Sequence, residues 1–395
     1  MTSLEKKCND KVIEILTFLD HKTNKNGLYC GQAGLSLFNM YYYKSICSLH
    51  NNEDIIVKNV IDSFNSINDN NHFEFSFCNG IAGINWMVLL LIENNILEKD
   101  EIKILHLLDE NLLLKMDVDL FSLNYDFLHG ALGIGYYFIK KYNFTQDPTP
   151  LIRIVNGLYK MANWENDMCY WLSKVGPEQE MGASISFAHG ISSIMVVLSK
   201  IYSNGIEQDK CKHLIEGGLN YINFQKRDDG NTSMYASVNI EYDKNPYSRL
   251  AWCYGDMGIS LAYKICGKHL KNEQWSNIAV RIALHMSQRR DLKINHVYDA
   301  CFCHGTSGIA QFFNRMYYET QIEEFYDAST YWVEKTLEMA SFHDGLAGFK
   351  TSQSEKRGGW VNESSLLEGI AGIGLTLLSF YHPKSIEWDK VFLMS

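Results

Sequence analysis

Residues 251–263, AWCYGDMGISLAY, and residues 301–313, CFCHGTSGIAQFF, follow one template and decide the fold of this 395-residue chain. Each stretch has a cysteine, then a tyrosine or histidine, a glycine, two further residues, a second glycine and an apolar run. Repeats of about 20 to 50 residues define whole architectures, so other copies of the template matter more than either copy alone.

The template recurs seven times along the chain. The first glycines of the copies are Gly31, Gly80, Gly130, Gly190, Gly255, Gly305 and Gly369. Successive first glycines lie 49 to 65 residues apart. Each unit therefore has room for two helices and a connection, and the longer intervals contain insertions. Such an array predicts a repeat fold.

The apolar run after each glycine pair predicts a buried inner helix. Residues 81–92 and 370–380 are hydrophobic nearly all the way round. The segments between the copies, such as residues 10–20 and 99–115, repeat apolar residues at intervals of three and four, which is typical of an amphipathic outer helix. We therefore predict an all-α fold, an α/α toroid of seven inner and seven outer helices. Ring closure removes the need for the polar end caps of an open solenoid.

In a toroid, the residues just before the glycines gather at one rim. The positions one and two residues before the first glycines hold chemically active side chains in most copies: Cys30, Cys78, Asn79, Leu128, His129, Ala188, His189, Cys253, Tyr254, Cys303, His304, Leu367 and Glu368. The helix N-termini at this rim favour thiolates and other anions.

Three of these rim residues suggest a zinc site. Cys253, Cys303 and His304 supply two thiolates and an imidazole, and a catalytic zinc keeps three protein ligands and one open position. Adjacent ligands can point at one ion only from an irregular turn. A thiol entering the open position would lose its proton, so the site suits activation of a substrate cysteine. Free cysteines are commonly buried, so Cys253 and Cys303 could instead be core residues. The spacing alone does not decide between the two interpretations.

Composition excludes several classes of partner. The formal net charge is −10, and no cluster of Lys and Arg alternates with aromatic residues, so we expect no nucleic-acid binding. No run reaches the ~18 apolar residues of a membrane span, and the N-terminus lacks the apolar region of a signal peptide. We expect a cytoplasmic protein whose ten cysteines are reduced.

The stretches AWCYGDMGI, CFCHGTSGIA, SFAHGISS and SLLEGIAGIGL, in this order, resemble the lanthionine synthetase C-like family, in particular its stand-alone bacterial cyclases. The resemblance covers essentially the whole chain. It implies a zinc-dependent lanthipeptide (lantibiotic) cyclase with one catalytic Zn²⁺. In such enzymes a cysteine thiolate of a dehydrated precursor peptide adds to dehydroalanine or dehydrobutyrine, which gives lanthionine or methyllanthionine thioether rings.

The resemblance also implies roles for individual residues. Cys253, Cys303 and His304 match the zinc ligands, and His189 in FAHG matches the proposed general acid/base. An imidazole with a pKa near ~6.5 suits proton transfer in both directions at neutral pH. In this interpretation three further cysteines near the template glycines lie outside the site: Cys30, Cys78 and Cys301.

Three more residues match positions near the family's site, and each has a structural alternative. Asp126 in YDFLHG matches an acidic residue, but it could cap a helix. Arg249 in SRLAWCYG matches a cation that could stabilise an enolate, but it could form a structural ion pair. Tyr254 matches the aromatic residue next to the first ligand, but it could pack in the core.

We predict one α/α-toroid domain over residues 1–395 with insertions at 161–186 and 225–248. The first interval is polar and aromatic with little periodicity, and the second has turn signals followed by a strand-like alternation. Both are expected to lie over the mouth. Related cyclases carry a small β-containing insertion that is suspected of contacting the peptide, and either interval could be its counterpart.

The resemblance implies a dehydrated precursor peptide as substrate. A dehydratase and an export transporter are further expected partners, in a membrane-associated complex that would hold the chain at the inner face of the membrane. Two alternatives are a non-catalytic, zinc-dependent thiol or glutathione binder of the same fold and a toroidal zinc prenyltransferase subunit. Prenyltransferases usually use Asp, Cys and His ligands, which disfavours them, whereas His189 together with Asp126 favours catalysis.

Overall fold

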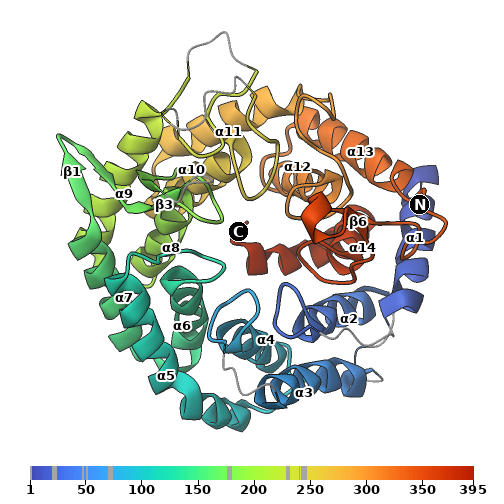
Figure 1. The fold of residues 1–395 in the computed structure, drawn as a ribbon, viewed down its shortest axis with the longest axis horizontal. Helices are drawn as coiled ribbons and strands as arrows, with labels where there is room; N and C mark the ends of the chain where they lie inside the picture. Colours follow the sequence, from blue (N-terminus) through green and yellow to red (C-terminus); the bar gives the residue numbers. More distant parts are fainter. Residues whose placement is uncertain are drawn as a thin grey trace. The chain divides into compact units, whose positions relative to one another are not determined.

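The computed structural model describes residues 2–19, 25–46, 49, 52–69, 74–175, 180–227, 232–239, 241 and 247–395. The chain divides into two compact units. Unit 1 comprises Met1–Glu74 and Arg290–Ser395, and unit 2 comprises Phe75–Arg289. Both units are built from pairs of one inner and one outer helix, as the sequence predicts (Figure 1).

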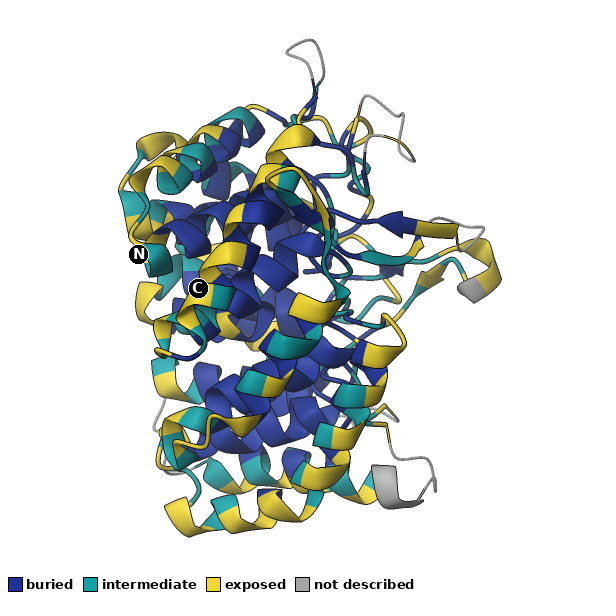
Figure 2. Cartoon of the chain, turned by 90° about the vertical axis from the view of Figure 1, so that its left-hand side faces the viewer, coloured by how far each residue is buried: buried dark blue, intermediate teal, exposed yellow. Residues whose placement is uncertain are grey.

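Unit 2 contains consecutive helix pairs. Its inner helices are α4 (Ile81–Glu93), α6 (Ala131–Thr145), α8 (Ile191–Ser203) and α10 (Asp256–Leu270), and its outer helices are α5 (Ile102–Phe121), α7 (Thr149–Met161), α9 (Gln208–Phe224) and α11 (Glu273–Ser287). A 3₁₀ turn, η2 (Lys99–Glu101), precedes α5. The inner helices are buried nearly all round, whereas α7 buries one stripe of leucine, isoleucine and valine (Figure 2).

Unit 1 joins the two ends of the chain. Its inner helices are α2 (Gln32–Ile46), α12 (Thr306–Thr320) and α14 (Ile370–Tyr381), and its outer helices are α1 (Ser3–Leu19), α3 (Glu53–Asp69) and α13 (Glu323–Glu338). The strands β5 (Thr351–Ser352) and β6 (Trp360–Val361) form an antiparallel pair around η3 (Glu355–Arg357). Helix α1 packs against α14, so the first helix completes the last pair.

A C-terminal 3₁₀ segment, η4 (Pro383–Phe392), is fixed to unit 1 by buried contacts. The guanidinium of Arg315 donates to both carboxylate oxygens of Asp389, at 2.6 and 3.0 Å. The ring of Phe392 stacks between Phe302 and Tyr29, with centroid distances of 4.0 and 4.6 Å. Both rings immediately precede template turns, so η4 supports the starts of α12 and α2.

The first predicted insertion contains β-structure. Strands β1 (Asn163–Glu165) and β2 (Met168–Tyr170) form one antiparallel hairpin, and β3 (Leu172–Val175) and β4 (Glu180–Ala183) form another. The described residues of the second interval, 225–227, 232–239, 241 and 247–248, form turns and bends without a strand. Part of its strand-like alternation, at 228–231, 240 and 242–246, lies outside the described residues.

The template glycines stand directly before the inner helices, as predicted. Of these seven described glycines only Gly255 has a positive φ, +74°. A positive φ therefore accounts for the glycine at one of these described turns. Elsewhere the backbone is extended and crowding excludes a side chain: a Cβ at Gly130 or Gly190 would lie 2.3 to 2.4 Å from a carbonyl oxygen six residues earlier.

Replacing Gly255 with alanine is expected to destabilise the chain by about 3 kcal/mol, because left-handed strain of about 1–2 kcal/mol adds to steric overlap. Its Cβ would lie 2.7 Å from Ser248 Oγ and 2.8 Å from the Arg249 carbonyl oxygen. Gly205 is a matched control, because it has φ +78° and nothing within 4 Å of its Cβ position. Urea denaturation of both variants should show the larger loss at Gly255, and equal losses would exclude crowding as the cause.

Candidate functional site

Backbone hydrogen bonds connect the pre-glycine turns of unit 2, the turns that stand directly before the template glycines. The N–H of Cys78 donates to the Leu128 carbonyl at 2.9 Å, and the N–H of Phe127 donates to the Ala188 carbonyl at 3.2 Å. The N–H of Ala188 donates in turn to the Cys253 carbonyl at 3.2 Å. Turns 50 to 65 residues apart in sequence are therefore neighbours, as predicted, and their side chains share one end of this unit.

The pre-glycine turns of unit 1 are connected in the same way. The N–H of Cys303 donates to the Leu367 carbonyl at 3.0 Å, and the N–H of Leu367 donates to the Tyr29 carbonyl at 2.9 Å. The turn that carries Cys303 and His304 is thereby fixed to two others within its own unit.

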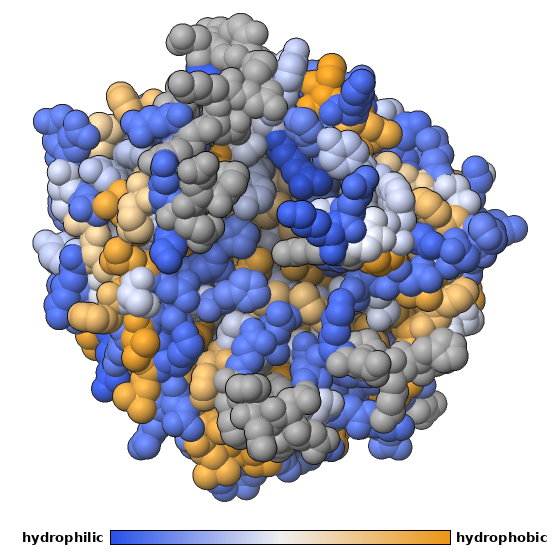
Figure 3. Space-filling view, viewed as in Figure 1, coloured by the Kyte–Doolittle hydropathy of each residue, from blue (hydrophilic) through white to orange (hydrophobic). Residues whose placement is uncertain are grey.

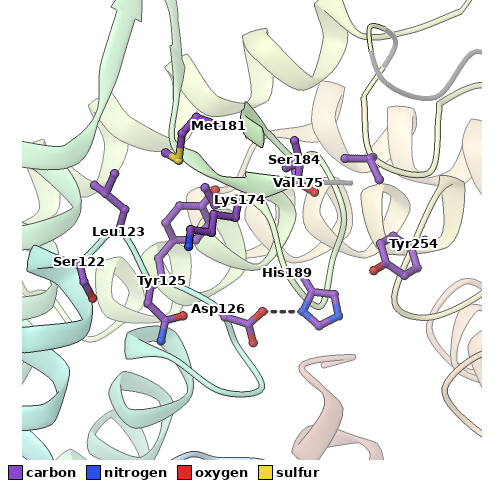
Figure 4. A pocket seen from close by; sticks show the side chains of 13 residues that line it. Ser122, Leu123, Tyr125, Asp126, Lys174, Val175, Met181, Ser184, His189 and Tyr254 are labelled. Atoms are coloured by element: carbon purple, nitrogen blue, oxygen red, sulfur yellow. Dashed lines mark hydrogen bonds and ion pairs between the residues drawn. The ribbon is translucent and has the colours of Figure 1, made fainter. Parts of the chain in front are cut away.

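His189 and Asp126 form an ion pair within unit 2. His189 Nδ1 lies 2.5 Å from Asp126 Oδ2. The other carboxylate oxygen, Oδ1, accepts the backbone N–H groups of Leu128 and His129 at 2.7 and 2.8 Å. Asp126 thus holds its own turn, as the capping alternative requires, and also orients His189. With a proton on Nδ1, the imidazole keeps Nε2 as its acceptor, on the side away from the carboxylate (Figure 4).

The pair changes the pKa of both groups. Burial lowers the pKa of His189, but the hydrogen bond and the charge of Asp126, together with Cys253, outweigh it, so the net pKa lies above the usual 6.5. Burial raises the pKa of Asp126, but His189 and the His129 N–H outweigh it, so the net pKa lies below 3.8. Both shifts favour the charged pair.

The pair is expected to stabilise the folded chain most between about pH 4 and pH 6.5. The lowered pKa of Asp126 gives stability that is lost as the pH falls through its folded value. The raised pKa of His189 gives stability that is lost as the pH rises through its folded value. Urea unfolding of the native chain and Asp126→Asn should differ more at about pH 5 than in alkaline buffer above the folded pKa of His189, where the imidazole is neutral. A difference that does not change with pH would contradict the pairing.

A cavity of about 670 Å³ lies beside this pair. Its walls come from the turns before α6, α8 and α10 and from both predicted insertions (Figure 4). The lining residues are Ser122, Leu123, Asn124, Tyr125, Asp126, Ser173, Lys174, Val175, Met181, Ser184, His189, Val238 and Tyr254. The rings of His189 and Tyr254 have centroids 5.8 Å apart. The cavity is large enough for a segment of a peptide or a similar small ligand.

Arg249 is not among the residues that line this cavity. It is half-buried, and its backbone N–H donates to Ser237 Oγ at 3.4 Å, which ties the segment before Cys253 to the second insertion. Its predicted role toward an enolate stays a prediction.

The three predicted metal ligands lie on the pre-glycine turns of both units. Cys253 is in unit 2, and Cys303 and His304 are in unit 1. The turns are irregular, as adjacent ligands require, and both thiols are buried, with exposed fractions of 4% and 8%. That these three side chains bind one metal ion stays a prediction.

Unit 1 holds a group of possible metal ligands that the sequence reasoning missed in part. The ligand atoms of Asp299, Cys301 and His304 lie within 4.8 Å of one another. Asp299 Oδ2 is 3.9 Å from His304 Nε2 and also accepts the N–H of Ser352 at 2.8 Å. Asp299 Oδ1 accepts the N–H of Cys301 at 3.0 Å, and burial raises the pKa of the Cys301 thiol well above its usual value.

One signal in the sequence could have identified Asp299. It stands six residues before the first glycine of its copy, where other copies have Ser184 and Glu363. In all three copies a side-chain oxygen at this position accepts the backbone N–H two residues later, at 3.0 to 3.3 Å. The position is a recurring turn acceptor, and in this copy a carboxylate occupies it beside a predicted ligand.

The chain belongs to the lanthionine synthetase C-like protein family, whose model matches residues 22–393. No curated protein sequence matches it significantly. In the described part of the chain, no helix combines the length and the apolar character that spanning a bilayer requires.

Among solved structures, the chain is similar to nisin cyclase, with a TM-score of 0.73 and 17% identity over 100% of this chain and 98% of that one. A polysaccharide lyase matches with a TM-score of 0.49 and 11% identity over 98% and 99% of the two chains. Cellobiose 2-epimerase from Bacillus thermoamylovorans matches with a TM-score of 0.40 and 12% identity over 64% and 71%. The likeness to nisin cyclase confirms the predicted fold class, an all-α α/α toroid.

Proposed function

We propose that this chain is a zinc-dependent lanthipeptide cyclase, which forms thioether rings in a dehydrated precursor peptide. Membership of the lanthionine synthetase C-like family and the similarity to nisin cyclase support the reaction class. The observation that carries the proposal is the His189–Asp126 pair at the wall of a cavity of about 670 Å³. An oriented imidazole beside a cavity is the arrangement that proton transfer to a bound substrate needs.

The residues that would hold the zinc are Cys253, Cys303 and His304. Two thiols and an imidazole on irregular turns fit a zinc site that leaves a position for substrate. Bound zinc would lower the pKa of a substrate thiol, so that a thiolate is available at neutral pH. Asp299 would support this site, because its oxygens already accept the N–H groups of Cys301 and Ser352 beside His304.

His189 would move the proton of the reaction. In the neutral form of His189, Asp126 holds the single proton on Nδ1, so Nε2 accepts the proton that the substrate thiol loses. The raised pKa of His189 favours the imidazolium that results. The sulfur then bonds to the β-carbon of the dehydro residue, and the electrons of the C=C bond pass to the α-carbon and its carbonyl as an enolate. Return of the proton from Nε2 to the α-carbon completes the addition, so the reaction neither consumes nor releases atoms.

Two more residues complete the proposed site. Tyr254 lines the cavity beside His189, where it would limit the positions open to the substrate. Arg249, four residues before Cys253, would supply positive charge toward the enolate. The insertions at 161–186 and 225–248 would contact the peptide within a single cyclase domain, because each contributes to the cavity wall.

The direct test is incubation of the purified zinc-loaded protein with a dehydrated precursor peptide. Cyclisation leaves the peptide mass unchanged, so the rings are counted by alkylating the remaining thiols before mass spectrometry. We expect one alkylation site to disappear for each ring formed. A constant number of thiols would contradict the cyclase. Binding of glutathione without any loss of thiols would favour the non-catalytic thiol binder.

A further inference from the structure

One face of the outer helix α5 carries an exposed apolar stripe. Ile104, Leu107, Leu114, Val118 and Phe121 have exposed fractions of 57% to 92%. Hydrophobic side chains gather at the lower left margin of the surface in Figure 3, where Figure 1 places α5. Singly exposed apolar residues are ordinary, whereas a contiguous stripe of five on one helix indicates a contact surface.

The stripe is separate from the face that fixes α5 to unit 2. The helix buries Leu105, Leu112, Met116 and Leu120 against its own unit. At about 100° per residue, the centre of the stripe lies roughly 170° around the helix from the centre of this buried set. The exposed side chains therefore point away from the unit that carries them and are not part of its core.

The spacing within the stripe is that of a two-stranded coiled coil. Residues 104, 107, 111, 114, 118 and 121 follow one another at alternating intervals of three and four. The a positions are Ile104, Asn111 and Val118, and the d positions are Leu107, Leu114 and Phe121. β-branched residues at a with leucine at d favour parallel dimers, and a single asparagine at a sets the register at some cost in stability.

The flanking charges also match a second copy of the same helix. Glu110 occupies a g position, and Lys115 occupies the following e position. In a parallel pair these two positions face each other across the interface, so opposite charges meet twice. Lys115 also donates to Asp119 of its own helix at 2.5 Å, but an ammonium has two further donors.

We propose that two copies of this chain associate through α5 as a parallel, two-stranded coiled coil. The inference is independent of the proposed catalytic function, because α5 supplies none of the proposed catalytic residues. The stripe spans 18 residues, or about 25 Å, which is about two and a half heptads. Such an interface is near the lower limit of about 1,000 Å² for specific association. We therefore expect a weak dimer that is measurable at about 1 to 100 µM.

Analytical ultracentrifugation of the full chain over this concentration range tests the proposal. The native chain should sediment as a dimer in equilibrium with monomer, and Leu114→Glu should sediment as a monomer, because it places a charge at the centre of the stripe. Phe224→Glu is the matched control, since Phe224 is 65% exposed on another outer helix. It should dimerise like the native chain. Circular dichroism should show equal helix content in all three proteins.

A cross-linking measurement tests the parallel orientation. Ile104→Cys should give a covalent dimer with a short bismaleimide, because a parallel pair brings residue 104 of both copies together. In an antiparallel pair it would face residue 121, about 25 Å away along the helix. His106→Cys, on the same helix but outside the stripe, should not cross-link. A native chain that is monomeric at about 100 µM, a dimer that survives Leu114→Glu, or Ile104→Cys without cross-links would each overturn the proposal.

Discussion

Replacing Cys303 with alanine is expected to remove bound zinc and cyclase activity together. The proposed site has three protein ligands, and loss of one thiolate leaves two, which is too few for a stable catalytic zinc. After dialysis, the zinc content measured by atomic emission should fall from about one ion per chain to near zero. Thiol counting on the peptide should show no ring formation above the uncatalysed background.

Cys301→Ala is the matched control for this variant. Cys301 lies two residues away on the same segment and belongs to the other possible group of ligands, with Asp299 and His304. If the proposed set is correct, Cys301→Ala keeps its zinc and Cys303→Ala loses it. The reverse result would move the metal to the Asp299 group and would refute the assignment of Cys303.

His189→Ala is expected to keep zinc but to lower kcat by about 10²- to 10⁴-fold, the usual contribution of a general acid/base. The imidazole is not among the proposed ligands, so the metal content should not change. Its loss removes the acceptor for the thiol proton, and it leaves Asp126 with the backbone N–H groups of Leu128 and His129.

His129→Ala provides the control at the same end of unit 2. This histidine is exposed, and it contacts Asp126 through its backbone N–H, which alanine retains. We expect a kcat close to that of the native chain. Equal losses of activity in the two histidine variants would contradict a catalytic role that is specific to His189.

The helical repeat could be predicted because the same glycine motif occurs before every inner helix. Seven glycine turns, each followed by an apolar run, define where the inner helices begin, and the structure places each helix directly after its glycine. The conformation of these glycines could not be predicted in the same way. Gly255 alone has a positive φ, whereas at Gly130 and Gly190 a carbonyl oxygen six residues earlier in the same turn leaves no room for a side chain. The template shows glycine in both cases, so it does not reveal which of the two causes applies.

The candidate site was predictable where a residue belongs to the template. His189 and Tyr254 stand directly before glycines, and both line the cavity. Asp299 was missed because its position accepts the same hydrogen bond with serine or glutamate in other copies, so no single residue type marks it. The strands β1 to β4 have three or four residues each. Such strands are too short to be recognised from an alternation of apolar and polar residues.

Unit 2 is continuous along the chain, whereas unit 1 combines segments from both sides of it. During synthesis, the helix pairs of unit 2 can therefore pack against one another while α12 to α14 are still missing. Helix α1 packs against α14, which is synthesised more than 350 residues later. The apolar side of α1 therefore stays uncovered until α14 has been made. The nascent chain thus leaves the ribosome with an unfinished N-terminal segment that chaperones would have to protect until translation ends.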